Sequence, residues 1–235
     1  MKIVQVEDFF YPKAGYQINI LSKMWSASGH EVEIITAKKK HMSKKLIDFF
    51  SVGELDQVDE EFSRNYNVMI HRVEAYGLFS SRVLFKKNII NKINQINADI
   101  IFVHGNDTFI GILATLHHKK LNAPLVMDSH MQQIASKNRF SWLFKYIYKK
   151  LITPIIKSNN IKIIKTVQLD YVNKIYHIPV QLTPYLGFGS DTTLFKPDHK
   201  QRNIIRKKYG LTSDSRVFIY AGKINRNKGI DILAK

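Results

Sequence analysis

The sequence predicts an α/β fold with a Rossmann-like parallel sheet. An apolar run at residues 2–6, a helical pattern at 16–28 and a second apolar run at 31–35 follow one another directly. Strand, helix and strand in this order imply parallel strands joined by a right-handed crossover. Further strand and helix patterns alternate along the chain. Ligands of such a sheet bind at the carboxyl ends of its strands, so the residues that follow each strand are the candidates for function.

The composition indicates a globular protein that attracts anions. The chain has 235 residues, 45% of them hydrophobic, and a formal net charge of +17. That charge fits nucleic acid, an anionic membrane surface or phosphorylated ligands as partners. Zinc-finger spacing, an RNA-binding aromatic signature and a compact helix-turn-helix are all missing, so we expect no nucleic-acid partner. Cysteine is absent, which excludes disulfides and thiolate metal sites.

The start of the chain reaches acidic residues too early for a signal-peptide core, and no apolar run approaches the ~20 residues of a membrane span. A cytoplasmic location is therefore expected. The loop at 9–15, which follows the first strand, has a single glycine, Gly15. The Gly-x-Gly-x-x-Gly of nicotinamide-dinucleotide domains is missing, so a cofactor of that class is not expected.

The remaining elements follow from periodicity and from glycine and proline signals. Residues 37–66 are polar with little periodicity and predict a long surface loop beside the cleft. The other predicted elements are a strand at 68–73, a helix marked by Phe85, Ile89, Ile93 and Ile96, strands at 99–103 and 125–127, helices at 109–119 and 137–157, a strand at 161–167, a helix at 169–176, a short strand at 180–183, a helix at 201–209 and a strand at 217–221.

Three polar residues follow two of these strands. His104 comes after one strand, and Asp128 and His130 come at the end of the next. Such residues can simply cap a strand end. Their place at the ligand-binding edge favours a function, because histidine donates hydrogen bonds to sugar hydroxyls or phosphate. His117 and His118 lie within a helical pattern without a metal-ligand partner, so we expect them at the surface and expect no metal.

The segment 137–157 carries an apolar stripe at helical spacing, which predicts packing on the sheet. The stripe is Phe140, Leu143, Phe144, Ile147, Leu151 and Ile155. Aromatic residues and lysines fill the positions between, namely Trp142, Lys145, Tyr146, Lys149 and Lys150. Exposed aromatics among lysines suit the headgroup region of an anionic membrane. The sequence leaves open whether this helix is an ordinary packed helix or also a membrane-binding surface.

The stretch 217–233 has the pattern of a phosphate-binding turn. A strand-like run ends at Gly222, a short polar loop follows, and Lys228 and Gly229 begin a helical pattern. Backbone N–H groups and the side chains of Lys223 and Lys228 would converge at the start of that helix. The alternative is an ordinary turn between strand and helix whose lysines are solvated.

This stretch resembles the donor domain of family 4 glycosyltransferases, which are retaining enzymes of the GT-B fold. The family carries a Gly-Arg/Lys-x-x-x-x-Lys-Gly-x-Asp run, matched here by Gly222, Lys223, Lys228, Gly229 and Asp231. The opening resembles the acceptor domain of the same family through Tyr11, Pro12, Gly15, Tyr16 and Gln17, with Ala14 where the family more often has a second glycine. Pro124, Val126 and His130 fit its Pro-x-Val-x-x-x-His pattern, and His104 fits a Val-His-Gly element.

The resemblance implies transfer of a sugar from a nucleotide-sugar donor to a hydroxyl of a glycan or lipid-linked acceptor, with retention and without a metal. Lys223 and Lys228 would bind the donor diphosphate, and Gly15 would let the backbone approach it. His130 would be the catalytic residue that orients the sugar. Further candidates in the cleft are Tyr16, Gln17, His104 and Asp128.

The resemblance also implies a division into domains. Residues 1–186 would form the complete acceptor-side domain, 187–200 the interdomain crossing and 201–235 the incomplete start of the sugar-nucleotide-binding domain. The crossing is rich in glycine and proline, although a surface loop within one domain has the same composition. We therefore expect a hexosyl-type glycosyltransferase that is inactive as the chain stands. The alternative is a non-catalytic module that binds a glycan or lipid or docks a partner.

Overall fold

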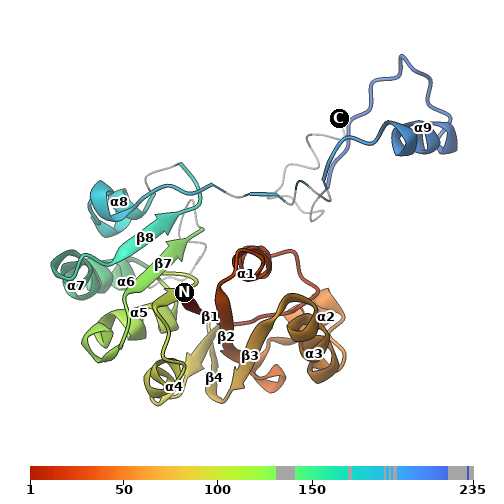
Figure 1. Ribbon diagram of the computed structural model, residues 1–235. Coiled ribbons are helices and arrows are strands. Elements are labelled where there is room, and N and C mark those ends of the chain that lie inside the picture. The colour runs from red at the N-terminus through yellow and green to blue at the C-terminus, as the bar shows by residue number, and fades with distance from the viewer. Residues whose placement is uncertain are drawn as a thin grey trace. The chain divides into compact units, whose positions relative to one another are not determined.

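The computed structural model describes residues 1–130, 141–168, 171–187, 189–190, 192, 195–221 and 232. The chain divides into two compact units, Met1–Gly189 and Ser190–Lys235. The first unit contains the sheet (Figure 1). It also contains all of the described cavities. No helix within the described part of the chain is long and apolar enough to cross a membrane.

The first unit is built on a six-stranded parallel sheet, as the sequence predicts. The strand order is β3-β2-β1-β6-β7-β8 (Figure 1). The order reverses between β1 and β6, where Val6 pairs with Ile35 on one side and with Val103 on the other. The strands are β1 Lys2–Glu7, β2 Glu31–Ala37, β3 Val68–Val73, β6 Ile100–Val103, β7 Leu125–Ser129 and β8 Lys162–Lys165. Such a reversal opens a crevice at the carboxyl ends of the two strands.

Both faces of the sheet are buried, because successive side chains of a strand point to opposite faces. Ile34 belongs to a core that also contains Phe62, whereas its neighbour Ile35 belongs to the core around Ile93 and Ile110. The first face is covered by α1 (Gln17–Ala27) and α3 (Leu55–Tyr66). The second is covered by α4 (Ile89–Gln95), α5 (Phe109–Leu116), α7 (Thr153–Ser158) and α8 (Tyr171–Tyr176).

The prediction of a long surface loop at 37–66 is wrong. This segment forms the 3-10 turn η1 (Lys39–His41), the helix α2 (Lys44–Phe50) and α3. The Ser43 hydroxyl caps α2 by accepting the N–H of Leu46. Leu55 and Phe62 are buried at a spacing of two helical turns, which ties α3 to the sheet. The expected position of the segment beside the cleft is nevertheless found, as described below.

An antiparallel hairpin, β4 (Ala75–Phe79) and β5 (Arg82–Phe85), was not predicted. Phe85 lies in β5, although its spacing from Ile89 suggests a helix. The turn consists of Ser80 and Ser81 with φ of 51° and 65°, values that glycine and asparagine adopt more readily. Because the turn lacks those residues, the sequence shows no hairpin signal there. Val83 and Phe85 are buried and anchor the hairpin to the core.

The predicted apolar stripe of 137–157 is only partly found where the structure describes it, because Phe144 packs against the core but other members of the stripe are exposed. The helix α6 (Ser141–Ile147) continues through a π-helical turn, η3 (Tyr148–Ile152), into α7. A π turn adds a residue and rotates the helix face that follows. Tyr148, Ile152 and Ile156 are buried, whereas Leu143, Ile147 and Leu151 are 39%, 44% and 58% exposed. Residues 137–140 lie outside the described part.

Two shorter predictions also change. The strand expected at 180–183 is the 3-10 turn η4 (Val180–Leu182), and the end of α5 continues into a similar turn, η2 (His118–Lys120). The second unit contains α9 (His199–Lys208), close to the predicted helix and capped by the Asp198 carboxylate. Residues 217–221 have no strand partner among the described residues, and Phe218 is 87% exposed. The strand predicted there is therefore wrong.

Candidate functional site

The candidate site lies at the reversal of strand order. β1 ends in Glu7 and is followed by Asp8, β6 is followed by His104, and β7 ends just before His130. Because these strands are parallel, their carboxyl ends meet at one edge of the sheet. Sequence and topology thus bring acidic and imidazole side chains together.

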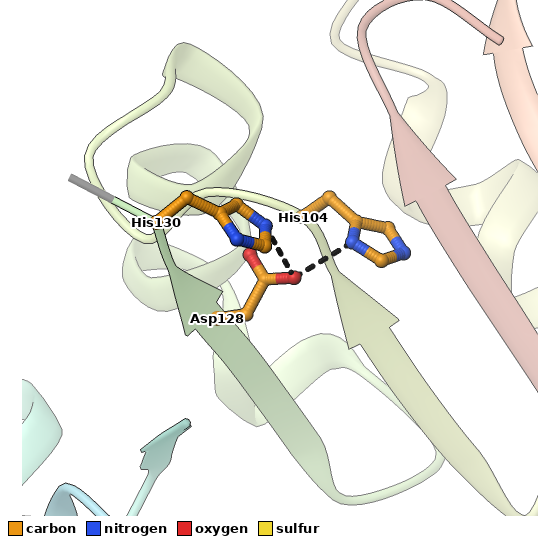
Figure 2. Close-up of side chains that lie close together, drawn as sticks. All are labelled: His104, Asp128 and His130. Atoms are coloured by element: carbon orange, nitrogen blue, oxygen red, sulfur yellow. Dashed lines mark hydrogen bonds and ion pairs between the residues drawn. The ribbon is translucent and has the colours of Figure 1, made fainter. Parts of the chain in front are cut away.

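Asp128 links the two histidines (Figure 2). Its Oδ2 lies 2.7 Å from Nδ1 of His104 and 3.0 Å from Nε2 of His130, and its Oδ1 accepts the N–H of Gly105 at 2.7 Å. Burial of Asp128 would raise the pKa of its carboxyl. The charge of His104 and the hydrogen bonds from both histidines outweigh that effect and hold the pKa well below the ordinary value of 3.8.

His104 carries a proton on both ring nitrogens, because each faces an acceptor. The Ser22 hydroxyl donates to the carbonyl of Ile18 and therefore accepts from Nε2 of Gln5. That fixes the Gln5 amide with Oε1 toward Nε2 of His104 at 3.0 Å, while Nδ1 faces the Asp128 carboxylate. His104 is only 2% exposed, so it forms a buried cation next to a buried anion.

Local packing explains the Gly105 that follows His104. Its φ is +90°, and an added Cβ would lie 2.5 Å from Cγ2 of Thr108. The Thr108 hydroxyl in turn caps α5 by accepting the N–H of Gly111. A Cβ on Gly111 would lie 2.3 Å from the Gly105 carbonyl oxygen. The turn after β6 therefore needs both glycines, and it aims the Gly105 N–H at Asp128.

His130 is the member of the cluster that reaches the surface, with its side chain 34% exposed. Its Nδ1 lies 3.1 Å from the Thr166 hydroxyl, while Nε2 faces Asp128. The ring is therefore held from two sides before any ligand arrives.

A cavity of about 390 Å³ opens beside this cluster. Its polar part is formed by Glu7, Asp8, Gln17, Arg82, His104 and His130. Its apolar wall is formed by Phe9, Tyr11, Tyr16, Ile18, Met42, Leu46 and Phe50. The ring of Phe50 lies 5.5 Å from that of Tyr11 and 5.6 Å from that of Tyr16. The cavity is thus lined by charged groups on one side and aromatic rings on the other.

Burial perturbs both acidic residues at the end of β1. It raises the pKa of Glu7 from 4.5 to about 7, partly offset by the charge of His104. It raises the pKa of Asp8 from 3.8 to about 6, partly offset by Arg82. The guanidinium of Arg82 lies 3.7 Å from Oδ2 of Asp8, too far for a close ion pair. Two carboxyls that titrate near neutral pH therefore line one cavity.

The loop after β1 is fixed by side chains from three other elements. The Thr36 hydroxyl accepts the N–H of Phe10 at 2.9 Å, and Arg72 donates to the Phe10 carbonyl at 3.1 Å. Asn19 of α1 donates to the carbonyls of Tyr11 and Pro12. The loop is rigidly placed although it is irregular, so it can present a defined surface to a ligand.

Among the predicted site residues, the structure brings Tyr16, Gln17, His104 and His130 to one cavity, with Asp128 beneath the histidines. Gly15 is exposed beside Tyr16, and an added Cβ there would meet no atom within 4 Å. Gly222, Lys223, Lys228, Gly229 and Asp231 lie outside the described residues.

Sequence reasoning missed Glu7, Asp8 and Arg82, together with the apolar wall from α2 and the preceding turn. Glu7 and Asp8 had a usable signal, because they follow a buried strand at the ligand-binding edge. Arg82 had none, since the hairpin that carries it lacks a turn signature. Met42, Leu46 and Phe50 recur at four-residue spacing, a helical signal in a segment that otherwise suggests a loop.

One cluster among the described residues has the composition of a metal site. Ligand atoms of His104, Asp128 and His130 all lie within 4.8 Å of one another. Tetrahedral zinc would separate such atoms by about 3.3 Å. The Asp128 oxygen lies closer than that to both nitrogens, at 2.7 and 3.0 Å, which are hydrogen-bond distances. The observed geometry is a hydrogen-bonded cluster, and a metal would require the ligand atoms to move apart.

Comparison with solved structures gives the fold. The chain resembles sucrose-phosphate synthase from Thermosynechococcus elongatus with a TM-score of 0.58 and 15% identity, over 99% of this chain and 58% of that one. It also resembles a UDP-glycosyltransferase of Glycyrrhiza uralensis complexed with glycyrrhetinic acid 3-O-monoglucuronide, with a TM-score of 0.42 and 12% identity, over 86% of this chain and 51% of that one. The first likeness confirms the predicted α/β fold of the GT-B type. No protein-family model and no curated protein matches the chain.

Proposed function

We propose that the chain is the acceptor-side part of a retaining glycosyltransferase that transfers a sugar from a nucleotide sugar to an acceptor hydroxyl. The observation that carries the proposal is the position of the cavity. It lies at the switch point of a GT-B type sheet, with the histidine–aspartate cluster at its edge. The structure with the similar fold is, by its name, an enzyme that synthesises a sugar phosphate.

In this reaction the protein acts by positioning and electrostatics. His130 orients the transferred sugar, and Asp128 and Thr166 hold its ring. A ligand that hydrogen-bonds His130 would replace one of these two contacts, so the ring can respond to binding without losing its place. His104 supplies a fixed positive charge behind Asp128, which keeps that carboxyl ionised.

Gly15 supports the proposed approach of a diphosphate. A glycine is required where φ is positive or where a neighbouring atom leaves no room for Cβ. Neither condition holds at Gly15, because the space around it is open. A ligand that comes close to the backbone would explain the residue. Lys223 and Lys228 would then pair with the same diphosphate, as the resemblance implies.

We also propose that an anionic membrane is a partner, through a surface that we call the basic aromatic ridge. It comprises Trp142, Leu143, Lys145, Tyr146, Ile147, Lys149, Lys150 and Leu151. Trp142 is 65% and Tyr146 56% exposed, and the π turn leaves Leu151 exposed as well. Large apolar groups mixed with lysines match the headgroup region of an anionic bilayer. A lipid-linked acceptor would be reached from such a surface.

The proposal is tested with a protein that carries this chain together with a complete donor domain. It is incubated with a panel of radiolabelled nucleotide sugars and candidate acceptors, and product formation is measured. We expect transfer from at least one donor, and we expect residues 1–235 alone to give none. A protein that binds a glycan or lipid but uses no donor would instead be the non-catalytic module.

A further inference from the structure

Two side-chain oxygen atoms, each on a residue that lines the cavity, have no hydrogen-bond partner among the described residues. They are Oδ1 of Asp8 and Oε1 of Gln17, and both atoms are buried. A buried acceptor without a donor is costly, so most such atoms in native proteins have a partner. Two unpaired acceptors in one cavity point to a ligand that supplies hydrogen-bond donors.

Asp8 is fixed with one oxygen already engaged. The residue is 2% exposed, and its Oδ2 faces the N–H of Val83 at 3.4 Å and the guanidinium of Arg82. Its Oδ1 is therefore held in place without a partner. Gln17 is the first residue of α1 and lines the same cavity.

The rest of the lining restricts the ligand further. Tyr11 and Tyr16 each contact the ring of Phe50, and the three rings form an aromatic wall suited to the C–H face of a saturated ring. When ionised, Glu7 and Asp8 disfavour an anion beside them in the cavity. A plain alkyl chain would fit the wall but would leave both oxygens unpaired. A neutral ring that carries hydroxyl groups satisfies both requirements.

We propose that this cavity binds a neutral sugar ring of the acceptor, whose hydroxyls donate hydrogen bonds to Oδ1 of Asp8 and Oε1 of Gln17 while its C–H face packs against Tyr11, Tyr16 and Phe50. The inference rests on the proposed function for the role of this ring as acceptor. The cavity volume of about 390 Å³ accommodates one sugar ring together with part of a substituent. The acceptor is thus a glycan or a glycolipid that presents its sugar, rather than a simple lipid alcohol.

The experiment measures binding to residues 1–235 directly, without donor or turnover. Methyl α-D-glucopyranoside, methyl α-D-mannopyranoside and methyl α-D-galactopyranoside are titrated by calorimetry and by saturation-transfer NMR. We expect at least one of them to bind. Gln17→Met should weaken that binding about tenfold, the effect of one lost hydrogen bond in a closed site. Asp8→Asn should weaken it at least as much, because a donor would replace the unpaired acceptor.

The matched control is Gln95→Met, which makes the same change at the exposed end of α4, in a separate cavity that Lys2, Glu33 and His71 also line. Its binding should equal that of the parent chain. If thermal melts show that Asp8→Asn is unfolded, the result for Gln17→Met alone tests the inference. Gln17 is only partly buried, so its substitution should not prevent folding. The inference is wrong if none of the three glycosides binds, or if Gln17→Met binds as tightly as the parent.

Inorganic phosphate and octanol are added as competitors in separate titrations. Displacement of the glycoside by phosphate would mean an anion site and would overturn the inference, as would tighter binding of octanol than of every glycoside. Failure of the proposed function gives a different result. A protein that binds the glycoside but transfers no sugar refutes the enzyme, whereas transfer to an acceptor without a sugar ring refutes only this inference.

Discussion

His104 donates a hydrogen bond of 2.7 Å to Oδ2 of Asp128, across two neighbouring strands and with both residues almost completely buried. The histidine is a cation because its other nitrogen donates to Gln5. A buried charge is tolerated only when it is paired and hydrogen-bonded. The pair is thus a structural unit as well as the support for His130.

Asp128→Asn should destabilise the protein strongly. The change removes the only carboxylate that is hydrogen-bonded to His104 in the described part and leaves a buried cation without its ion-pair partner, an effect of about 3–5 kcal/mol. Thermal and urea unfolding measure it. The control is Asp107→Asn at the same edge, where the carboxylate accepts from the Tyr176 hydroxyl and pairs with no histidine among the described residues. If both variants lost the same free energy of unfolding, the ion pair between His104 and Asp128 would make no special contribution to stability.

Stability should fall as pH rises from about 4 to about 7 because of Glu7 and Asp8. Their pKa values are raised to about 7 and about 6, so the folded state binds more protons than the unfolded state between pH 4 and these values. For Asp8, the rise of the pKa from 3.8 to about 6 corresponds to a loss of at most roughly 3 kcal/mol in the free energy of unfolding. The charged groups that act on this pair are Arg82, His104 and Asp128.

Glu7→Gln and Asp8→Asn should therefore stabilise the protein at pH 8 relative to the parent, and less so at pH 5. Melting temperatures at the two pH values measure the difference. Glu60→Gln, at an exposed position on α3, should show no such dependence. A constant difference between variant and parent across pH 5–8 would mean that neither carboxyl titrates in this range.

Gly15→Ala and Gly105→Ala should separate a ligand-binding glycine from a structural one. Gly105→Ala should lower the free energy of unfolding by about 1–3 kcal/mol, because φ is positive at this position and the added Cβ would clash with Thr108. Gly15→Ala should leave the melting temperature nearly unchanged, since the added methyl group enters open space. In a protein with a complete donor domain it should nevertheless reduce donor kcat/KM. Unchanged donor kinetics would remove Gly15 from the proposed diphosphate site.

The basic aromatic ridge should bind anionic vesicles in a salt-sensitive manner and neutral vesicles weakly. Each lysine near an anionic surface contributes about 1 kcal/mol. Changing Lys145, Lys149 and Lys150 together to Glu should abolish flotation with phosphatidylserine vesicles. The control changes three exposed lysines elsewhere in the first unit, Lys92, Lys119 and Lys120, to Glu. Equal binding to both vesicle types, or equal loss of vesicle binding in the two triple variants, would refute membrane binding by the ridge.

The sequence predicts the sheet well, because buried parallel strands appear as short apolar runs separated by helical patterns. It also predicts that His104, Asp128 and His130 lie at one edge, since parallel strands end together. Their hydrogen bonds could not be predicted, because side-chain geometry depends on packing across strands. Likewise, nothing in the sequence marks Arg82 as a neighbour of Asp8, because a Ser-Ser turn hides the hairpin that brings them together.

The buried face of the helical region after residue 140 could not be predicted from the sequence either. Its apolar spacing fits a regular α-helix, and a regular helix would bury Leu143, Ile147 and Leu151. The structure instead inserts a π turn at Tyr148, whose hydroxyl donates to the carbonyl of Asn106 in the turn after β6. A tertiary contact therefore decides which face is buried, and periodicity alone does not contain it.

The central claim is that His130 serves sugar transfer. Its direct test is the kinetics of His130→Ala in a protein that carries this chain with a complete donor domain. We expect transfer by the parent and a kcat at least tenfold lower in the variant, with nearly unchanged donor binding and melting temperature. His117→Ala, at the end of α5 away from the cavity, should behave like the parent. Parent-like kcat in His130→Ala, or no transfer by the parent from any nucleotide sugar, would contradict the account.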